Sequence, residues 1–252
     1  MLKKIPFFDY PQLFNSYEND LTNIFKDVGK RGAFIMQKDL EEFEANLANY
    51  TGAKHAIGVA NATDGLQIGL MAGGLTNEGE VLISSHTMIA TASAIHYAGG
   101  IPVPVECGKN LMIDINSAEE ALTDKTVAIM PTQLNGRTCD MDEIINFATK
   151  NNLSIYEDAA QALGSKFKNK YAGTFGIASA ISLYPAKILG CLGDGGAILT
   201  NDSDVYEQIL LLRDHGRNPT SGEVISWGFN SRLDNIQAAF LNYFFSTYVE
   251  VI

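Results

Sequence analysis

The chain has 252 residues, of which 46% are hydrophobic and 19% are charged, and this balance excludes a disordered chain. Its 18 basic and 29 acidic residues give a formal net charge of −11, which argues against nucleic acid as a partner because phosphate binding uses clustered Lys and Arg. The three cysteines form no CxxC pair, so we expect no disulfide framework and no metal site, and we predict a cytoplasmic location.

The start of the chain contains a Lys pair and apolar side chains, but Pro6, Asp9 and Pro11 interrupt the apolar stretch. We therefore expect no signal peptide. No run of 18 apolar residues occurs in the sequence, so we also expect no membrane-spanning segment. Residues 1–14 are predicted to form an N-terminal arm.

Seven short segments rich in β-branched and apolar residues are predicted to be strands. They are residues 55–60, 81–85, 101–106, 126–132, 153–157, 178–184 and 196–201. Several are apolar throughout, which is typical of strands buried on both faces of a mostly parallel sheet. Segments with the pattern of helices alternate with them, in residues 38–50, 63–73, 90–98, 142–150 and 204–215. This alternation predicts a three-layer α/β/α fold with about seven strands and with ligands at the carboxyl ends of the strands.

The last predicted helix, residues 233–250, contains the aromatic sequence Tyr243-Phe244-Phe245 and few charges. Apolar surface of this extent needs something to pack against. The chain's own domain is one alternative, and a following segment or a partner subunit is the other. No linker interrupts the earlier sequence, so residues 15–240 are predicted to form one large domain.

Two strand ends carry motifs that are weak when each is taken alone. Asp158 follows the strand at residues 153–157, where α/β proteins bind ligands, but an isolated Asp there is also an ordinary helix N-cap. Thr63 and Asp64 stand between the first strand and a helix. Backbone N–H groups at a helix start form an anion site, although Thr and Asp are also common capping residues.

Lys187 follows the strand at residues 178–184 and lies among apolar and small residues. Partial burial lowers the pKa of such a lysine and favours the neutral amine needed for Schiff-base chemistry, whereas the alternative is a surface Lys in a glycine-rich turn. Gly193, Gly195 and Gly196 are expected to let the backbone turn tightly before the next strand. The G-x-G-x-x-G fingerprint is absent after the first strand, which argues against a nicotinamide-binding protein.

Together, a lysine, a carboxylate and a phosphate site at neighbouring strand ends are what pyridoxal 5′-phosphate requires. The sequence resembles the DegT/DnrJ/EryC1/StrS family of sugar aminotransferases. The stretches that carry the resemblance include NATDGLQIGL, YEDAAQALGSKF, SLYPAKILGCLGDGGAILTND and WGFNSRLDNIQAAFL, in the family's order. The resemblance implies the large domain of the type I fold of pyridoxal-phosphate-dependent transferases. It also implies transfer of an amino group from L-glutamate or glutamine to a keto sugar on a nucleoside diphosphate.

The resemblance implies roles for individual residues. Lys187 would hold the cofactor covalently and move a proton, and Asp158 would pair with the ring nitrogen. The full set of implied cofactor-binding residues is Thr63, Asp64, Met88, Asp158, Gln161, Ser182, Lys187 and Asn230. Gln161 would lie near the phenolic oxygen, and Ser182 would bind the phosphate with the helix start. Asn230 would reach the phosphate of a neighbouring subunit, so a homodimer is implied.

Three features depart from the family pattern. Met88 stands where the family usually has an aromatic residue that stacks on the ring, and the nearby His86 is a candidate substitute. Ala62 replaces a glycine, which is acceptable only if its φ is negative. Family members also continue beyond the equivalent of Ile252, so residues 241–252 are expected to begin a small C-terminal domain.

Two alternatives to an active aminotransferase stay open. The chain is a catalytically incomplete fragment that binds the cofactor or a partner without turnover, or it belongs to the family's sugar dehydratases. The dehydratases have His at the lysine position, so Lys187 argues against them.

Overall fold

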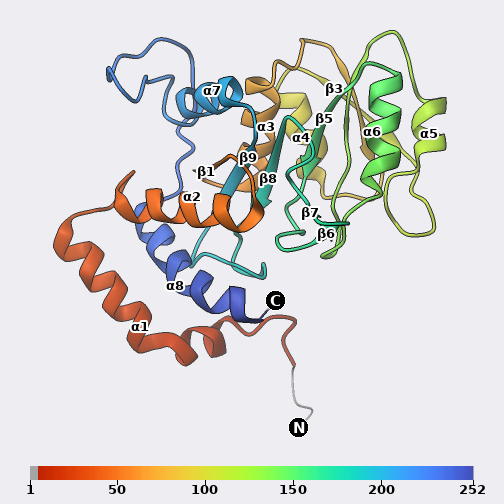
Figure 1. Ribbon diagram of the computed structural model, residues 1–252. Coiled ribbons are helices and arrows are strands. Elements are labelled where there is room, and N and C mark those ends of the chain that lie inside the picture. The colour runs from red at the N-terminus through yellow and green to blue at the C-terminus, as the bar shows by residue number, and fades with distance from the viewer. Residues whose placement is uncertain (1–4, 252) are drawn as a thin grey trace.

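The computed structural model describes residues 5–251, without the side chains of residues 249–251. A mixed sheet occupies the centre of the molecule (Figure 1). Its strands are β1 (His55–Val59), β2 (Glu80–Ser84), β3 (Ile101–Val105), β4 (Thr126–Met130), β5 (Ser154–Asp158), β8 (Ala178–Ser182) and β9 (Gly196–Thr200). All seven predicted strands are confirmed, with shifts of only a residue or two at their ends.

The strands lie in the order β1-β9-β8-β5-β4-β2-β3. Strand β9 pairs antiparallel with both of its neighbours, and the other neighbouring pairs are parallel. The prediction of a mostly parallel, seven-stranded sheet is confirmed. Because β4, β5 and β8 run in parallel, their carboxyl ends meet at one edge, and residues that follow these strands come close together.

Helices cover both faces of the sheet and form the predicted three layers. One face packs against α3 (Ala62–Ala72), α4 (Ile89–Tyr97) and α7 (Ser203–Arg213). The other face packs against α2 (Lys38–Thr51), α5 (Ile115–Glu120), α6 (Met141–Lys150) and α8 (Asn235–Val251). Buried apolar side chains fill both interfaces and supply most of the stabilisation of the fold. No helix in the described part of the chain is long and apolar enough to cross a bilayer.

Four elements were not predicted from the sequence, and the longest is helix α1 (Tyr10–Arg31). Asp9 caps its start by accepting a hydrogen bond from the Gln12 N–H, at 3.0 Å. Pro11 lies in the first turn, where its missing N–H costs nothing, so Asp9 and Pro11 are residues typical of a helix start. The other missed elements are α5 and the short hairpin of β6 (Lys166–Phe167) and β7 (Lys170–Tyr171).

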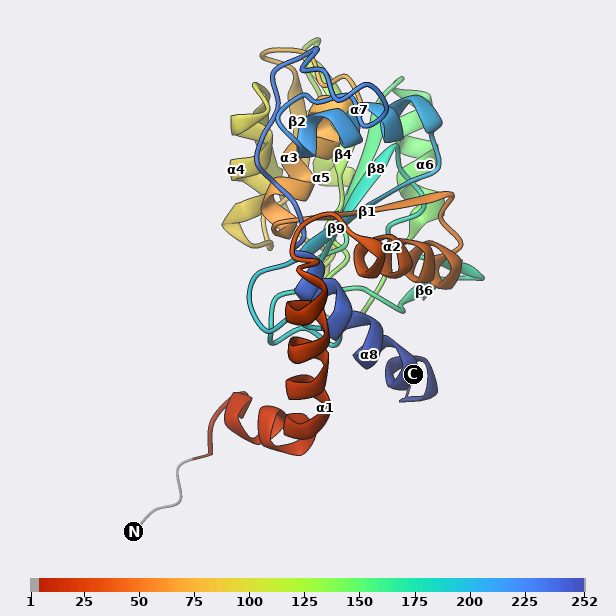
Figure 2. The same ribbon diagram turned by 90° about the vertical axis from the view of Figure 1, so that its left-hand side faces the viewer.

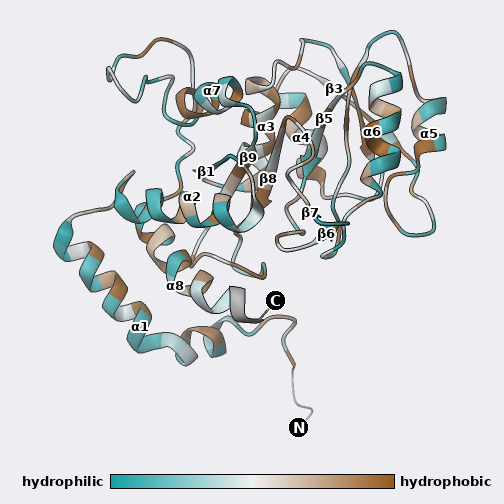
Figure 3. Cartoon of the chain, in the orientation of Figure 1, coloured by the Kyte–Doolittle hydropathy of each residue, from teal (hydrophilic) through white to brown (hydrophobic). Residues whose placement is uncertain are grey.

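Helix α1 projects from the sheet and contacts α8 (Figure 2). Its surface carries hydrophilic and hydrophobic bands (Figure 3). The Tyr17 ring lies edge-on to the rings of Tyr243 and Phe244, with centroids 6.1 and 5.5 Å away. Phe245 and Tyr248 are buried in the core shared with α2. The aromatic part of α8 therefore packs against its own chain, which is the first of the two alternatives.

Neither predicted domain boundary coincides with a break in the structure. The boundary after residue 14 falls inside α1, and the boundary after residue 240 falls inside α8. Residues 1–4 of the expected N-terminal arm and residue 252 of the expected C-terminal segment lie outside the described residues. The segments 1–14 and 241–252 remain predictions.

Candidate active site

A cavity of about 410 Å³ opens at the carboxyl ends of β5 and β8. Six of the eight predicted site residues line it. They are Thr63, Met88, Asp158, Gln161, Ser182 and Lys187. The sheet topology thus brings together side chains that are more than a hundred residues apart in the sequence.

Asp158 ends β5 and is only 4% exposed. Its Oδ2 accepts a hydrogen bond from Thr91 Oγ1 at 2.6 Å, and its Oδ1 accepts one from the Ala160 N–H at 3.1 Å. Burial raises the pKa of Asp158, whereas these hydrogen bonds and the charge of Lys187 lower it. The residues after Asp158 form turns rather than a helix, so it is not a helix N-cap.

Lys187 lies in the loop after β8, and its backbone N–H donates to the Tyr184 carbonyl at 2.8 Å. The side chain is half-buried. Burial lowers the pKa of Lys187, and the negative charge of Asp158 opposes that change. The amine is therefore neutral over a wider pH range than that of a surface lysine, as a nucleophile requires.

The loop after β4 orients Gln161, a contact that the sequence analysis did not predict. The Asn135 N–H donates to Gln161 Oε1 at 3.3 Å, and the Gly136 N–H donates to the Gln161 carbonyl at 2.9 Å. Asn135 and Gly136 both have positive φ, 54° and 69°, which turns these two N–H groups toward Gln161. Because the Gln161 side-chain oxygen is used, its amide nitrogen is the group left to donate into the cavity.

The start of α3 forms part of the cavity wall. Asn61 caps this helix by accepting from the Asp64 N–H at 2.9 Å, and the Asp64 carboxylate accepts from Ser231 Oγ at 2.7 Å. Asp64 does not line the cavity, and its N–H donates to Asn61. The phosphate contact of this N–H stays a prediction. Ala62 is the first helical residue, so its φ is negative and its Cβ is tolerated.

Close packing, rather than a turn, explains the glycine at the start of β9. Gly193, Gly195 and Gly196 all have φ outside the left-handed region, contrary to the expectation of a tight turn that uses their freedom. A Cβ on Gly196 would lie 2.5 Å from the Asn61 carbonyl carbon and 2.6 Å from the Ala62 nitrogen. Gly196 thus allows β9 to pass directly beneath the start of α3 and fixes one wall of the cavity.

Met88 lines the cavity but is 62% exposed, and its Sδ accepts from the Ala90 N–H at 3.0 Å. His86 is exposed and does not line the cavity. Asn230 also lies outside the cavity, on the surface. It follows a loop that exposes Val224, Ile225 and Trp227, the last of them 97% exposed.

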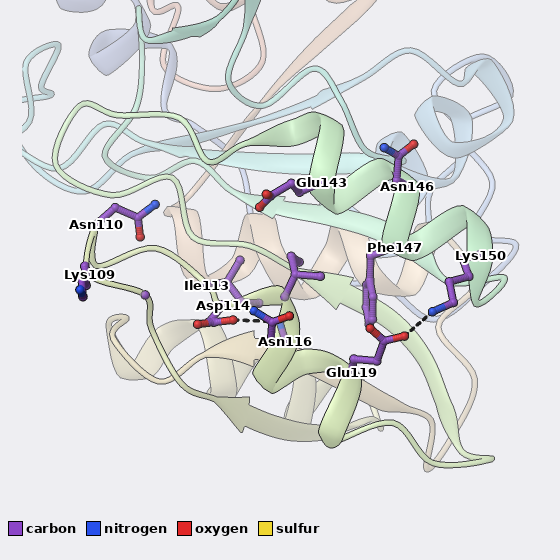
Figure 4. Close-up of a pocket in the computed structure, with 12 residues that line it drawn as sticks. Lys109, Asn110, Ile113, Asp114, Asn116, Glu119, Glu143, Asn146, Phe147 and Lys150 are labelled. Atoms are coloured by element: carbon purple, nitrogen blue, oxygen red, sulfur yellow. Dashed lines mark hydrogen bonds and ion pairs between the residues drawn. The ribbon is translucent and has the colours of Figure 1, made fainter.

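A larger cavity, of about 690 Å³, lies between α5 and α6 (Figure 4). Its wall includes an ion pair between Lys150 and Glu119, and none of the predicted site residues belongs to it. Both ion-pair side chains are largely exposed, and the ends of β5 and β8 contribute nothing to it. Most of the predicted site residues thus line the smaller cavity around Lys187. Residues 5–251 contain no group of three or more His, Cys, Asp or Glu side chains placed to hold a metal ion.

Residues 15–246 match the DegT/DnrJ/EryC1/StrS aminotransferase family. The chain belongs to this family. The resemblance drawn from the motifs is confirmed, and so is the fold it implied. Aminotransferases of the DegT/DnrJ/EryC1/StrS family depend on pyridoxal 5′-phosphate.

Two similar relatives in this family are named as sugar transaminases. The dTDP-3-amino-3,4,6-trideoxy-alpha-D-glucose transaminase of Streptomyces venezuelae is 38% identical over 94% of this chain and 63% of its own length. The dTDP-3-amino-3,6-dideoxy-alpha-D-galactopyranose transaminase of Aneurinibacillus thermoaerophilus is 41% identical over 94% of this chain and 66% of its own length. The chain therefore spans slightly less than two thirds of these relatives.

Two solved structures are similar to the chain over almost its whole length. DesV of S. venezuelae has a TM-score of 0.93 at 35% identity and covers 99% of this chain and 67% of its own. The Bacillus subtilis protein ntda, solved with bound cofactor PMP, has a TM-score of 0.89 at 32% identity and covers 99% of this chain and 57% of its own.

Proposed function

We propose that this chain is the cofactor-binding domain of a pyridoxal-phosphate-dependent transaminase. It transfers an amino group from L-glutamate or glutamine to a keto sugar carried on a nucleoside diphosphate. The observation that carries the proposal is that Lys187 and the buried Asp158 face one cavity from the ends of β8 and β5. The sugar-nucleotide substrates in the names of the relatives support the substrate class.

The residues present fit the cofactor. Asp158 is buried and lines the cavity, and a carboxylate in this position suits a protonated ring nitrogen, whose charge it would balance. The Gln161 amide nitrogen suits the phenolic oxygen. Ser182 and the N–H of Thr63 at the start of α3 suit the phosphate, whose charge the helix dipole favours.

Pyridoxal phosphate, when bound, supplies an electron sink for chemistry at the carbon that carries the amino group. The protein's own contribution is positioning and proton transfer. Lys187 Nζ holds the cofactor covalently and, once released, carries a proton to and from the reacting carbon. Asp158 keeps the ring nitrogen protonated. Met88 lines the cavity, and its polarizable side chain would pack on the ring in place of an aromatic residue.

The proposal includes a homodimer in which Asn230 reaches the phosphate bound by the partner subunit. Asn230 is exposed, and the loop before it exposes Trp227 almost completely. Exposed aromatic and apolar side chains of this kind favour burial in an interface. The cytoplasmic location also stays a prediction.

A visible absorption spectrum of the purified chain with added pyridoxal phosphate tests the function. We expect a band for cofactor attached to lysine, which bleaches when L-glutamate is added. Lys187→Ala should abolish both the band and the bleaching. Lys170→Ala is the matched control, because Lys170 lies on the short hairpin away from the cavity and should leave both unchanged.

The same spectra separate the two candidate functions. A band that forms but does not respond to L-glutamate supports the alternative, a domain that binds the cofactor without turnover. This alternative is tested directly because the chain spans slightly less than two thirds of the length of its relatives. If no band forms at any cofactor concentration, or if Lys187→Ala retains it, the proposed function is wrong for this chain.

A further inference from the structure

Three threonine hydroxyl groups form a chain that ends on the Asp158 carboxylate. Thr91 Oγ1 donates to Asp158 Oδ2 at 2.6 Å, and the Thr87 and Thr91 hydroxyl oxygens lie 2.7 Å apart. Thr132 Oγ1 donates to Thr87 Oγ1 at 2.9 Å. Thr132 follows β4, whereas Thr87 and Thr91 lie around the start of α4, so three segments of the chain meet at the end of β5.

The ionised carboxylate fixes the direction of all three hydrogen bonds. Its oxygens only accept hydrogen bonds, and each threonine hydroxyl has one proton to donate. Thr91 uses its proton on Asp158, so the proton between Thr87 and Thr91 must come from Thr87, which in turn accepts from Thr132. All three O–H dipoles then point toward Asp158. Hydrogen bonds in such a series strengthen one another.

Burial makes these hydrogen bonds important for the charge on Asp158. Thr91 is fully buried, and Thr132 and Asp158 are 5% and 4% exposed. Away from water, a charge depends on the few groups that contact it. The other ionisable groups that line the cavity beside Asp158 are Tyr184, Lys187 and Asp194, and of these only the cationic Lys187 favours an ionised carboxylate.

We propose that Thr132, Thr87 and Thr91 act as one positioning unit that fixes the orientation of the Asp158 carboxylate and keeps it charged. Thr87 and Thr132 line the cavity and Thr91 does not, so Thr91 acts on a bound molecule only through the groups it contacts, Asp158 and Thr87. The inference rests on the proposed function only in taking Asp158 as the partner of the ring nitrogen. The state of Asp158 itself is measurable in the protein without cofactor.

The test is the pKa of Asp158 in the cofactor-free protein. Aspartate labelled with ¹³C at the carboxyl carbon is followed by NMR as the pH changes, and the Asp158 signal is the one missing from Asp158→Asn. Thr91→Val keeps the shape but removes the last donor, and should raise the Asp158 pKa by about one pH unit or more. Thr91→Ser keeps the donor and should restore the original value.

Two further variants distinguish an effect of the linked threonines on the Asp158 pKa from a general effect of losing a buried hydroxyl. Thr87→Val removes the middle hydroxyl and leaves the contact between Thr91 and Asp158, so it should raise the pKa by a smaller amount. Thr174→Val is the matched control, because Thr174 is buried and donates to the Tyr171 carbonyl at 2.7 Å, away from the cavity. It should leave the Asp158 pKa unchanged.

An Asp158 pKa that is unaltered in Thr91→Val overturns the proposal, and so does an unaltered value in Thr87→Val. Should Thr91→Val fail to fold, Thr87→Val and Thr91→Ser still decide between these outcomes. A second readout is the pyridoxal phosphate dissociation constant, which should weaken in Thr91→Val and recover in Thr91→Ser. If the wild type fails to bind the cofactor, the proposed function is wrong, and the titration of Asp158 still tests this inference.

Discussion

At the scale of single residues, the site depends on opposing influences on one amine. Burial disfavours the charged form of Lys187, and the negative charge of Asp158 favours it. The balance leaves the pKa of Lys187 below its ordinary value. A lysine in this state is neutral more often at physiological pH, and the neutral amine is the form that attacks a carbonyl group.

Removing the charge of Asp158 should therefore lower the pKa of Lys187 further. With Asp158→Asn, the ammonium form loses its nearby counter-charge while burial remains, and the expected fall is about one pH unit. The measurement is an NMR titration of the protein reductively methylated with ¹³C at its lysines, with Lys187→Arg identifying the signal. A Lys187 pKa that rises, or stays where it is, contradicts this account of the site.

A surface pair supplies the control for that titration. Asp142 pairs with Lys168, and both side chains are more than half exposed, at 57% and 66%. Asp142→Asn removes a charge of the same kind from the molecule without changing the cavity. It should leave the Lys187 signal where it is in the wild type, which separates a local effect of Asp158 from a change in net charge.

The sequence predicted these residues because strand ends are visible locally. Asp158 directly follows the apolar segment at residues 153–157, and Lys187 lies three positions after the segment at residues 178–184. Parallel strands place such positions at one edge. The groups that control them were not predictable in the same way. Thr91 donates to Asp158 across 67 positions in the sequence, and the Asn135 N–H donates to Gln161 from another loop. Both contacts are set by the packing of separate segments, which no local pattern encodes.

At the scale of elements, α2, β1 and α7 are joined by a buried ion pair. Arg213 donates to Glu44 and to the Gly58 carbonyl, and Glu44 accepts from the Gly58 N–H at 2.7 Å. The Arg213 and Glu44 side chains are only 7% and 18% exposed. The Arg213 Nε is buried without a hydrogen-bond partner, so the pair depends on the Nη1 contacts with Glu44 and Gly58. Loss of either partner therefore leaves a largely buried charge without compensation.

Arg213→Ala should therefore lower the free energy of unfolding by about 3 kcal/mol. Urea unfolding, followed by circular dichroism, measures this loss. Lys168→Ala is the control, since it breaks an exposed pair and should not change stability measurably. Equal losses in the two variants would show that the buried pair does not hold these elements together. Glu44→Gln provides an independent variant with nearly the original shape.

Helix α1 shows where local interpretation of a sequence fails at this scale. Pro6, Asp9 and Pro11 interrupt the apolar stretch and argue against a signal peptide, but no helix was predicted after them. Asp9 caps the helix and Pro11 lies in its first turn. A proline disrupts the interior of a helix but is common in its first turn. Whether such a residue indicates a helix therefore depends on the sequence that follows it. The strands were predictable because short runs of apolar residues are typical of strands in a sheet that is covered on both faces.

At the scale of the whole molecule, the proposed dimer makes each site depend on two subunits. Lys187 faces the cavity of its own chain, whereas Asn230 lies outside that cavity on an exposed loop. If Asn230 acts in the partner's site, the two residues of one chain serve different sites. Variants at these positions should then complement each other when mixed, because one subunit can supply what the other lacks.

A mixing experiment tests this arrangement. Lys187→Ala alone should show no lysine-bound cofactor band, and Asn230→Ala alone should show a weak one at limiting cofactor. After dissociation and random reassociation of equal amounts, half of the dimers are mixed, and each has one site with an intact Lys187 and the partner's Asn230. The band should therefore reach about a quarter of the wild-type intensity, above the Asn230→Ala contribution. If Asn230 acts within its own chain, mixing yields no intact site, and the band stays at the average of the two separate variants.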